Sequence, residues 1–272
     1  PDAIDDQTAA AMMLQGMTAQ YLLRRTYRVQ PGDAILLHAA AGGVGLIASQ
    51  WARHLGATVI GTVGSDDKAE LARAHGCHHA IVYSRENFAE RVREITGGQG
   101  VAVVYDSVGQ TTFMGSLDCL RPLGTMVSFG NASGPVPPFE PGILAAKGSL
   151  FLTRPTLMTY TAKRADLVAS AAELFEVVGS GVVKIEVRQT YPLAETAQAH
   201  RDLEARQTTG STVLLPLDYP RPDLGTRRRL AEKIPVSRAQ RRESEPLTWA
   251  GRLSKISCLA TARVFLHPPL TP

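Results

Sequence analysis

The stretch that decides the fold is residues 34–68, which read AILLHAAAGGVGLIASQWARHLGATVIGTVGSDDK. The apolar run at 34–38 has the length and composition of a buried strand, and glycines follow it closely. A helix-forming run comes next, and residues 58–63 form a second apolar run that ends in small residues. A strand, a glycine turn, a helix and a strand in this order predict a βαβ unit with parallel strands.

The glycines of this turn have the spacing Ala40-x-Gly42-x-x-Gly45, a variant of G-x-G-x-x-G that begins with alanine. Without a Cβ, Gly42 lets the backbone approach a pyrophosphate, and Gly45 lets the next helix pack closely on the strand. The helix expected over 44–55 then points its unpaired N–H groups and its positive dipole end at the phosphates. This context favours a dinucleotide-binding turn that includes Gly43, with an ordinary strand-to-helix turn as the alternative.

The end of the second strand indicates which dinucleotide is bound. An NAD site usually carries Asp or Glu there, about 20 residues beyond the glycines, whereas this chain has TVGS at 62–65. Ser65 is expected to cap the next helix, which places Asp66 and Asp67 in its first turn and Lys68 one residue further. A small strand end near a cation predicts NADPH rather than NADH. A solvated helix lysine is the alternative for Lys68.

Strands and helices continue to alternate along the chain, and nearly every strand position is apolar. The patterns predict strands at 79–83, 101–105, 124–129 and 149–152 and helices at 5–27, 67–75, 84–95 and 111–119. Beyond these they predict a helix at 162–178, a strand at 182–187, a helix at 193–206 and a strand at 211–215. The predicted fold class is α/β, a doubly wound parallel sheet (Rossmann fold) with strand order 3-2-1-4-5-6.

Ligands of this fold lie at the carboxyl ends of the strands, which identifies candidate site residues. They are Ser65, Lys68, Tyr83, Asp106, Val108, Phe129, Gly130 and Asn131. Tyr83 is expected to flank the adenosine phosphate, with an ordinary edge tyrosine as the alternative, and residues 129–131 are expected to line the nicotinamide side. Asp106 is expected to bond the backbone rather than react, and His38 to be a buried histidine whose ring nitrogens are satisfied.

The composition of the 272 residues is that of a soluble globular protein, with 44% hydrophobic and 20% charged residues. The length suits one large domain or two small ones. Three widely spaced cysteines, Cys77, Cys119 and Cys258, argue against a disulfide framework and structural zinc and fit a reducing, cytoplasmic location. No secretory signal is expected in the acidic N-terminal stretch, and the uncharged run at 7–23 is too polar for a membrane span.

Basic residues are concentrated near the end of the sequence. Residues 217–272 carry 11 of the 29 Lys and Arg residues but only 5 of the 25 Asp and Glu residues. This segment is also rich in proline and has no sustained periodicity, so a disordered tail or an aberrant extension is favoured over a nucleic-acid or membrane surface. The rest of the chain has no basic excess, so nucleic acid is not an expected partner.

Six stretches carry a family resemblance: 15–27 (QGMTAQYLLRRTY), 38–47 (HAAAGGVGLI), 61–65 (GTVGS), 103–109 (VVYDSVG), 127–131 (VSFGN) and 147–155 (KGSLFLTRP). In them the chain resembles the zinc-free quinone oxidoreductases of the medium-chain dehydrogenase/reductase superfamily, the NADPH:quinone reductase or zeta-crystallin-like group. The resemblance extends from about residue 5 to residue 216.

The resemblance implies that NADPH is the cofactor and that a hydride passes from NADPH to a quinone. It carries the family's NADPH contacts onto Tyr21, Gly43, Val44, Ser65, Lys68, Tyr83, Phe129, Asn131 and Arg206. Among these, Tyr21 and Arg206 rest on the resemblance alone. No catalytic residue and no metal site is predicted, and a homodimer is left open. Two alternatives remain, a related enoyl or alkenal double-bond reductase and a non-catalytic NADPH-binding module.

The resemblance also divides the chain into segments. Family members begin with a substrate-binding, GroES-like barrel of roughly a hundred residues or more, and this sequence is expected to lack it. The expected segments are a linker helix at 1–28, an NADP-binding domain at 29–160, elements returning toward the catalytic domain at 161–216, and the basic tail at 217–272. The sequence is therefore expected to be mainly the nucleotide-binding half of such an enzyme.

Overall fold

Six parallel strands form the centre of the computed structural model, which describes residues 4–216. Along the chain they are β1 (Ala34–Leu37), β2 (Thr58–Val63), β3 (His79–Val82), β4 (Val101–Asp106), β5 (Leu120–Ser128) and β6 (Phe151–Thr153). In the sheet they lie in the order β3-β2-β1-β4-β5-β6, and every neighbouring pair is parallel. The predicted doubly wound α/β fold is confirmed, and its strand order reverses between β1 and β4.

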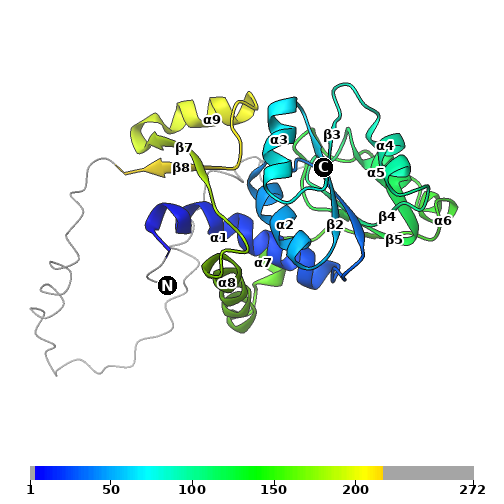
Figure 1. The fold of residues 1–272 in the computed structure, drawn as a ribbon, viewed down its shortest axis with the longest axis horizontal. Coiled ribbons are helices and arrows are strands. Elements are labelled where there is room, and N and C mark those ends of the chain that lie inside the picture. The colour runs from blue at the N-terminus through cyan, green and yellow to red at the C-terminus, as the bar shows by residue number, and fades with distance from the viewer. Residues whose placement is uncertain (1–3, 217–272) are drawn as a thin grey trace, which may run out of the picture.

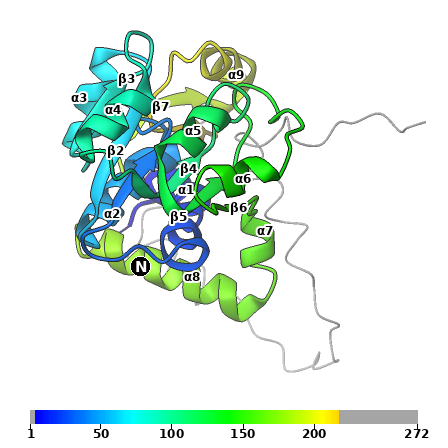
Figure 2. The same cartoon turned by 90° about the vertical axis from the view of Figure 1, so that its right-hand side faces the viewer.

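Helices cover both faces of this sheet (Figure 1, Figure 2). One face packs against α1 (Asp6–Tyr21), α2 (Gly43–His54), α3 (Asp66–Ala74) and α8 (Arg164–Gly179). The other face packs against α4 (Phe88–Ile95), α5 (Phe113–Cys119) and α6 (Gly142–Ala146). Successive residues of β4 belong to opposite cores, Val103 and Tyr105 to the first and Val104 to the second. This two-sided burial explains why the strand is apolar throughout rather than alternating.

The α-helix predicted over 5–27 ends earlier in the structure, where α1 stops at Tyr21. A π-helical turn at Leu22–Thr26 follows α1, so the segment predicted as one helix over 5–27 has two geometries. Gln20 and Arg24 both donate to the Glu173 carboxylate at 2.7 Å. These bonds fasten the end of α1 to α8.

A second sheet of two strands lies beside α1 (Figure 1). Its parallel strands are β7 (Val187–Pro192) and β8 (Ser211–Leu215), and η2 (Leu193–Glu195) and α9 (Thr196–Glu204) connect them. The Ser211 hydroxyl donates to the Ala11 carbonyl at 2.8 Å, which holds β8 against α1. The short helix α7 (Leu157–Tyr160) lies between β6 and α8.

The strand predicted over 182–187 is wrong, because the chain is irregular until β7 begins at Val187. Its apolar side chains pack into the core one by one, and Val183 is buried there. The Lys184 N–H donates to the side-chain oxygen of Gln50 at 2.9 Å instead of to a strand. The apolar run at 182–187 therefore indicates burial of its side chains and not pairing with a neighbouring strand.

The helix predicted over 84–95 begins later, at Phe88. The Asn87 side chain caps it by accepting a hydrogen bond from the Ala89 N–H at 3.0 Å. Ser84, where the predicted helix was to begin, instead donates weakly to the Gly64 carbonyl at 3.4 Å. The residues between β3 and α4 thus form a turn that lies over the end of β2.

The predicted basic tail at 217–272, with Cys258 in it, lies outside the described residues. No helix within residues 4–216 is both long enough and apolar enough to cross a bilayer. The strands of the main sheet lie inside the segment 29–160. The exact domain boundaries, and the return of 161–216 toward a catalytic domain, stay predictions.

Candidate functional site

The turn between β1 and α2 leaves the sheet between two neighbouring strands. The His38 N–H donates to the Tyr105 carbonyl on β4 at 3.0 Å, and the Ala40 N–H donates to the Thr62 carbonyl on β2 at 3.1 Å. The turn therefore lies where the strand order reverses. Open α/β sheets bind their ligands outside the carboxyl ends of the strands at such a switch point.

The N-terminus of α2 is open to an anion. Gly42 is the N-cap and has no side chain that could satisfy the N–H groups of the first turn. Those groups belong to Gly43, Val44 and Gly45. Gly42, Gly43 and Val44 are partly exposed, so solvent reaches the positive end of the helix dipole. Helix N-termini of this kind bind phosphate.

The three glycines of the turn differ in what a Cβ atom at each position would contact. A Cβ added at Gly45 would lie 2.4 Å from the Ala39 carbonyl oxygen, so a side chain there would push α2 off the sheet. A Cβ added at Gly43 would lie 3.0 Å from Cγ of Gln15, so the absence of a side chain here allows α1 to pack closely on the turn. At Gly42 a Cβ would have only the Ala39 oxygen near it, at 3.2 Å, which leaves the outer side of the turn clear.

The ends of β2 and β3 form a corner beside this turn. Ser65 is the N-cap of α3, as predicted, but its hydroxyl makes no cap bond to that helix and the residue is exposed. The Tyr83 hydroxyl lies against Gly64, since a Cβ added at Gly64 would come within 2.9 Å of it. Tyr83 is 46% exposed. Ser65, Tyr83 and, one turn into α3, Lys68 are therefore neighbouring polar groups at this corner.

Lys68 connects the corner to the loop that follows α9. Its ammonium donates to the Arg206 carbonyl at 2.9 Å. At the other end of the loop, Gly210 forms a parallel bridge with Gly42. The loop at 205–210 thus runs from Lys68 to the glycine turn. Spacing could not reveal this, because 138 positions separate Lys68 from Arg206.

Asp106 ends β4 and organises the loop on the far side of the switch point. One carboxylate oxygen accepts from the Val108 and Gly109 N–H groups, at 2.7 and 3.0 Å. The other accepts from the Thr112 hydroxyl at 2.8 Å. Asp106 is completely buried. Its predicted role as an acceptor for backbone groups is confirmed.

The loop after β5 packs directly on the loop after β4. The Phe129 N–H donates to the Asp106 carbonyl at 2.8 Å. A Cβ added at Gly130 would lie 2.5 Å from the Ser107 carbonyl oxygen, so only glycine allows this approach. The two touching loops contain the predicted site residues Val108, Phe129, Gly130 and Asn131.

His38 is a satisfied buried histidine, as predicted. Its Nδ1 lies 2.8 Å from the Thr62 hydroxyl and its Nε2 lies 2.9 Å from the Ser116 hydroxyl. Burial lowers its pKa, against an opposing effect of the Asp106 carboxylate. The ring is therefore neutral at neutral pH, and both its nitrogens are engaged inside the protein.

Tyr21 is almost entirely buried, unlike most of the other predicted site residues. It is 3% exposed, and its ring stacks on Tyr160 with centroids 4.5 Å apart. Burial is the main cause that raises its pKa to about 12. Its hydroxyl therefore stays protonated at physiological pH.

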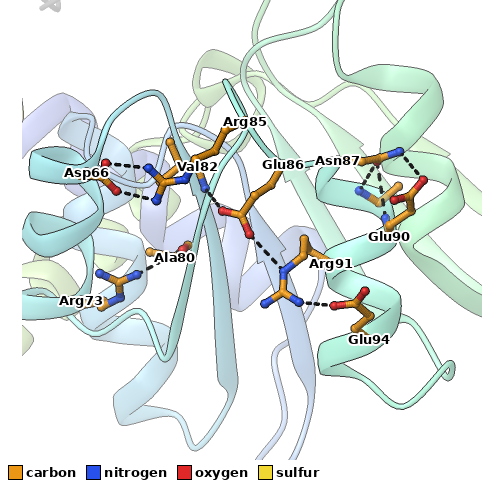
Figure 3. A network of polar contacts seen from close by, with 11 residues as sticks. Asp66, Arg73, Ala80, Val82, Arg85, Glu86, Asn87, Glu90, Arg91 and Glu94 are labelled. Carbon is orange, nitrogen blue, oxygen red and sulfur yellow. Dashed lines mark hydrogen bonds and ion pairs between the residues drawn. The ribbon is translucent and has the colours of Figure 1, made fainter.

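Arg85 is a charged residue of this edge that sequence reasoning missed. It lies in the turn after β3, and its guanidinium grips the Asp66 carboxylate through two hydrogen bonds of 2.6 Å (Figure 3). Hydrogen bonding by Arg85 lowers the pKa of Asp66. The one available signal was the expected adjacency of β2 and β3, which brings the residues after both strands together.

Comparison with known proteins gives consistent matches. A family model described as zinc-binding dehydrogenase matches residues 43–176. The chain is 57% identical to the quinone oxidoreductase of Pseudomonas aeruginosa over 216 residues, a match that covers 79% of this chain and 66% of that protein. It is 55% identical over 214 residues to a 2-haloacrylate reductase of a Burkholderia species, covering 78% and 64% of the two chains. The crystal structure of Escherichia coli quinone oxidoreductase complexed with NADPH matches with a TM-score of 0.78 at 52% identity, over 79% of this chain and 67% of that one.

The chain thus spans about two thirds of the length of the relatives it matches. Within residues 4–216, no three or more His, Cys, Asp and Glu side chains are grouped so that they could hold a metal ion. Identities of 52–57% to quinone oxidoreductases extend over nearly all of the described residues. The chain therefore belongs to the quinone oxidoreductase family of the medium-chain dehydrogenase/reductase superfamily.

Proposed function

We propose that this chain binds NADPH along the carboxyl edge of its main sheet and that the protein is an NADPH-dependent quinone oxidoreductase. One observation carries the proposal: the open N-terminus of α2 and the corner of Ser65, Lys68 and Tyr83 lie on the same edge. The first suits a pyrophosphate and the second suits an additional phosphate on the adenosine ribose. The E. coli relative, described as complexed with NADPH, supports this choice of cofactor.

The first anchor point is the helix N-terminus. The N–H groups of Gly43, Val44 and Gly45 bind the pyrophosphate, and Gly42 allows its close approach. The second anchor point is the corner, where the Lys68 ammonium has donors left beyond its bond to Arg206. Lys68 supplies the charge for the 2′-phosphate, and the exposed hydroxyls of Ser65 and Tyr83 supply hydrogen bonds.

The nicotinamide end lies over the loops after β4 and β5. When bound, NADPH supplies the hydride, and the protein's part is to orient the ring against the acceptor. Val108, Phe129, Gly130 and Asn131 form the floor, and the buried Asp106 carboxylate holds the loop of Val108 in place. Tyr21 and Arg206 complete the proposed contacts on the strength of the family resemblance.

Steady-state oxidation of NADPH with a simple quinone tests the proposed activity. Turnover that depends on both reactants, with NADPH bound more tightly than NADH, is the expected result. Tight NADPH binding without turnover would favour a non-catalytic NADPH-binding module. Failure to bind NADPH would overturn the proposal altogether.

A double-bond reductase is the second candidate, because the Burkholderia relative at 55% identity is a 2-haloacrylate reductase. Both reactions would use the same cofactor edge, so residues 4–216 favour neither. Replacing the quinone with 2-haloacrylate or a simple enone in the same assay separates them. A clear preference for the activated alkene would replace the quinone as the proposed substrate.

A homodimer is proposed through the edge of the sheet at β6. Among the described residues this strand has a neighbour on one side only, and Phe151 and Leu152 on it are 61% and 37% exposed. Exposed apolar edge strands pair readily with another chain. Light scattering of the purified protein tests this, and a monomer at working concentration would contradict it.

A cytoplasmic location is proposed from the cysteines. Within residues 4–216, Cys77 and Cys119 are both unpaired and buried. Burial raises their pKa to about 11 and about 12, so neither thiol is reactive. Inert, unpaired cysteines suit a reducing compartment. Fluorescence microscopy of a tagged copy tests this assignment.

A further inference from the structure

Among the described residues of the corner formed by the ends of β2 and β3, Asp66 is the one carboxylate whose two oxygens both accept hydrogen bonds from an arginine. It is the first residue of α3, three positions after β2 ends at Val63, and Arg85 binds it from the turn after β3 (Figure 3). Both hydrogen bonds are 2.6 Å long. The neighbouring Glu86 faces a different way, accepting from the Val82 N–H and pairing with Arg91.

This ion pair contributes little to stability. The side chains of Arg85 and Asp66 are 57% and 67% exposed, and exposed pairs are largely screened by solvent. The position of Asp66 is more informative than its energy. A dinucleotide-binding sheet that holds a ribose with a free 2′-hydroxyl uses an acidic residue at the end of this strand, and Asp66 lies three positions beyond that end, in the first turn of α3. The same carboxylate, left unpaired, would repel a 2′-phosphate.

We infer that Arg85 is a specificity residue of the cofactor site: it masks the Asp66 carboxylate and so keeps the end of β2 acceptable to a 2′-phosphate. The inference rests on the proposed NADPH site. The planar guanidinium fork matches both carboxylate oxygens, which a lysine could not do. Arg73 is the other cation near Asp66, but it donates to the Ala80 carbonyl at 3.4 Å and does not contact the carboxylate in the same way.

The test compares dissociation constants of NADPH and NADH, measured by fluorescence titration of the full chain. Arg85→Gln should weaken NADPH by about tenfold, since one unmasked charge near a phosphate is worth that much in partly screened surroundings. NADH should bind at least as tightly as before, because a free carboxylate accepts a hydrogen bond from the 2′-hydroxyl. The double variant Asp66→Asn/Arg85→Gln should recover NADPH binding to within about threefold of the original.

A matched control separates local masking from net charge. The variant Asp67→Asn/Arg85→Gln has the same net charge as the rescued double variant but leaves Asp66 unmasked. It should stay weak for NADPH, and circular dichroism should confirm that each variant folds.

Three outcomes have distinct meanings. If Asp66→Asn fails to rescue, Arg85 is a direct phosphate ligand and the masking is overturned. Equal rescue by Asp67→Asn would mean that only the overall field matters, which also overturns it. Failure of the unmodified protein to prefer NADPH over NADH would instead reject the proposed function.

Discussion

The Lys68 ammonium donates a hydrogen bond to the main-chain carbonyl of Arg206, 2.9 Å away and 138 positions later in the chain. This bond joins the corner of Ser65, Lys68 and Tyr83 at the end of β2 to the loop after α9. The loop continues to Gly210, which bridges to Gly42 of the glycine turn. One short loop therefore connects the two regions proposed to bind phosphate groups, and Lys68 has a structural role in addition to its proposed role in binding NADPH.

The first prediction concerns Lys68. Lys68→Ala should weaken NADPH binding roughly tenfold or more and NADH binding by less than about threefold, because only NADPH carries the extra phosphate that the ammonium neutralises. Isothermal titration with both cofactors measures the difference. Lys147→Ala is the control, since Lys147 pairs with Asp118 on the other side of the sheet. Equal losses for NADPH and NADH in Lys68→Ala would refute the assignment of the corner.

The second prediction concerns the close contact under α2. Gly45→Ala should lower the free energy of unfolding by roughly 1–3 kcal/mol, because the new methyl group meets two backbone carbonyls. Those oxygens belong to Ala39 and Ala40, at 2.4 and 2.6 Å from the added Cβ. Urea unfolding measures the loss, and binding of NADPH and NADH should weaken together as the helix shifts.

Gly179→Ala is the matched control for that change. Gly179 ends α8, and a Cβ added there meets nothing within 4 Å. Its effect should lie between zero and a stabilisation of about 1 kcal/mol. A Gly45→Ala variant as stable as this control would show that the turn can relax.

The order of the six strands and the place of the glycine turn could be predicted because both depend on local patterns. Apolar runs at regular spacing and a turn rich in glycine are enough to specify a doubly wound sheet. The strand predicted over 182–187 failed for the opposite reason, since burial without a pairing partner has the same apolar signature as a strand.

Individual side-chain and loop contacts between distant segments could not be predicted from the sequence. The predicted strand order brought β3 next to β2, but not the pairing of Arg85 with Asp66, 19 positions apart, among the residues after the two strands. Gly210 meets Gly42 through a loop whose path no local pattern records. Residue types at the strand ends thus predicted where the site lies. Which charged side chains pair with one another there could be seen only in the tertiary structure.

The third prediction concerns Asp106. Asp106→Ala should cost roughly 2–4 kcal/mol of stability, because it leaves the buried N–H groups of Val108 and Gly109 without their acceptor. NADPH binding should also weaken as the loop loses its shape. Thermal and urea unfolding measure the first effect, and cofactor titration the second. Asp118→Ala, at an exposed aspartate, should change stability by less than about 1 kcal/mol. A stable Asp106→Ala variant would contradict the proposed role.

The last prediction uses the pH dependence of stability. Burial lowers the pKa of His38 below its ordinary value of 6.5. As pH falls below about 6.5, the unfolded chain therefore binds a proton that the folded ring resists, and the folded state loses stability. The contribution of this residue is present above that pH and declines by up to about 1.4 kcal/mol per pH unit below it.

His38→Gln removes this titration and keeps a side chain able to bond with Thr62 and Ser116. Urea unfolding across the range from about pH 7.5 to about pH 5.5 should give a shallower decline for the variant than for the original protein. Its stability near neutral pH will be lower if the amide packs less well, so the slope and not the absolute value carries the test. Equal slopes of unfolding free energy against pH for the two proteins would contradict the prediction. They would mean that the His38 ring binds a proton as readily in the folded protein as in the unfolded chain.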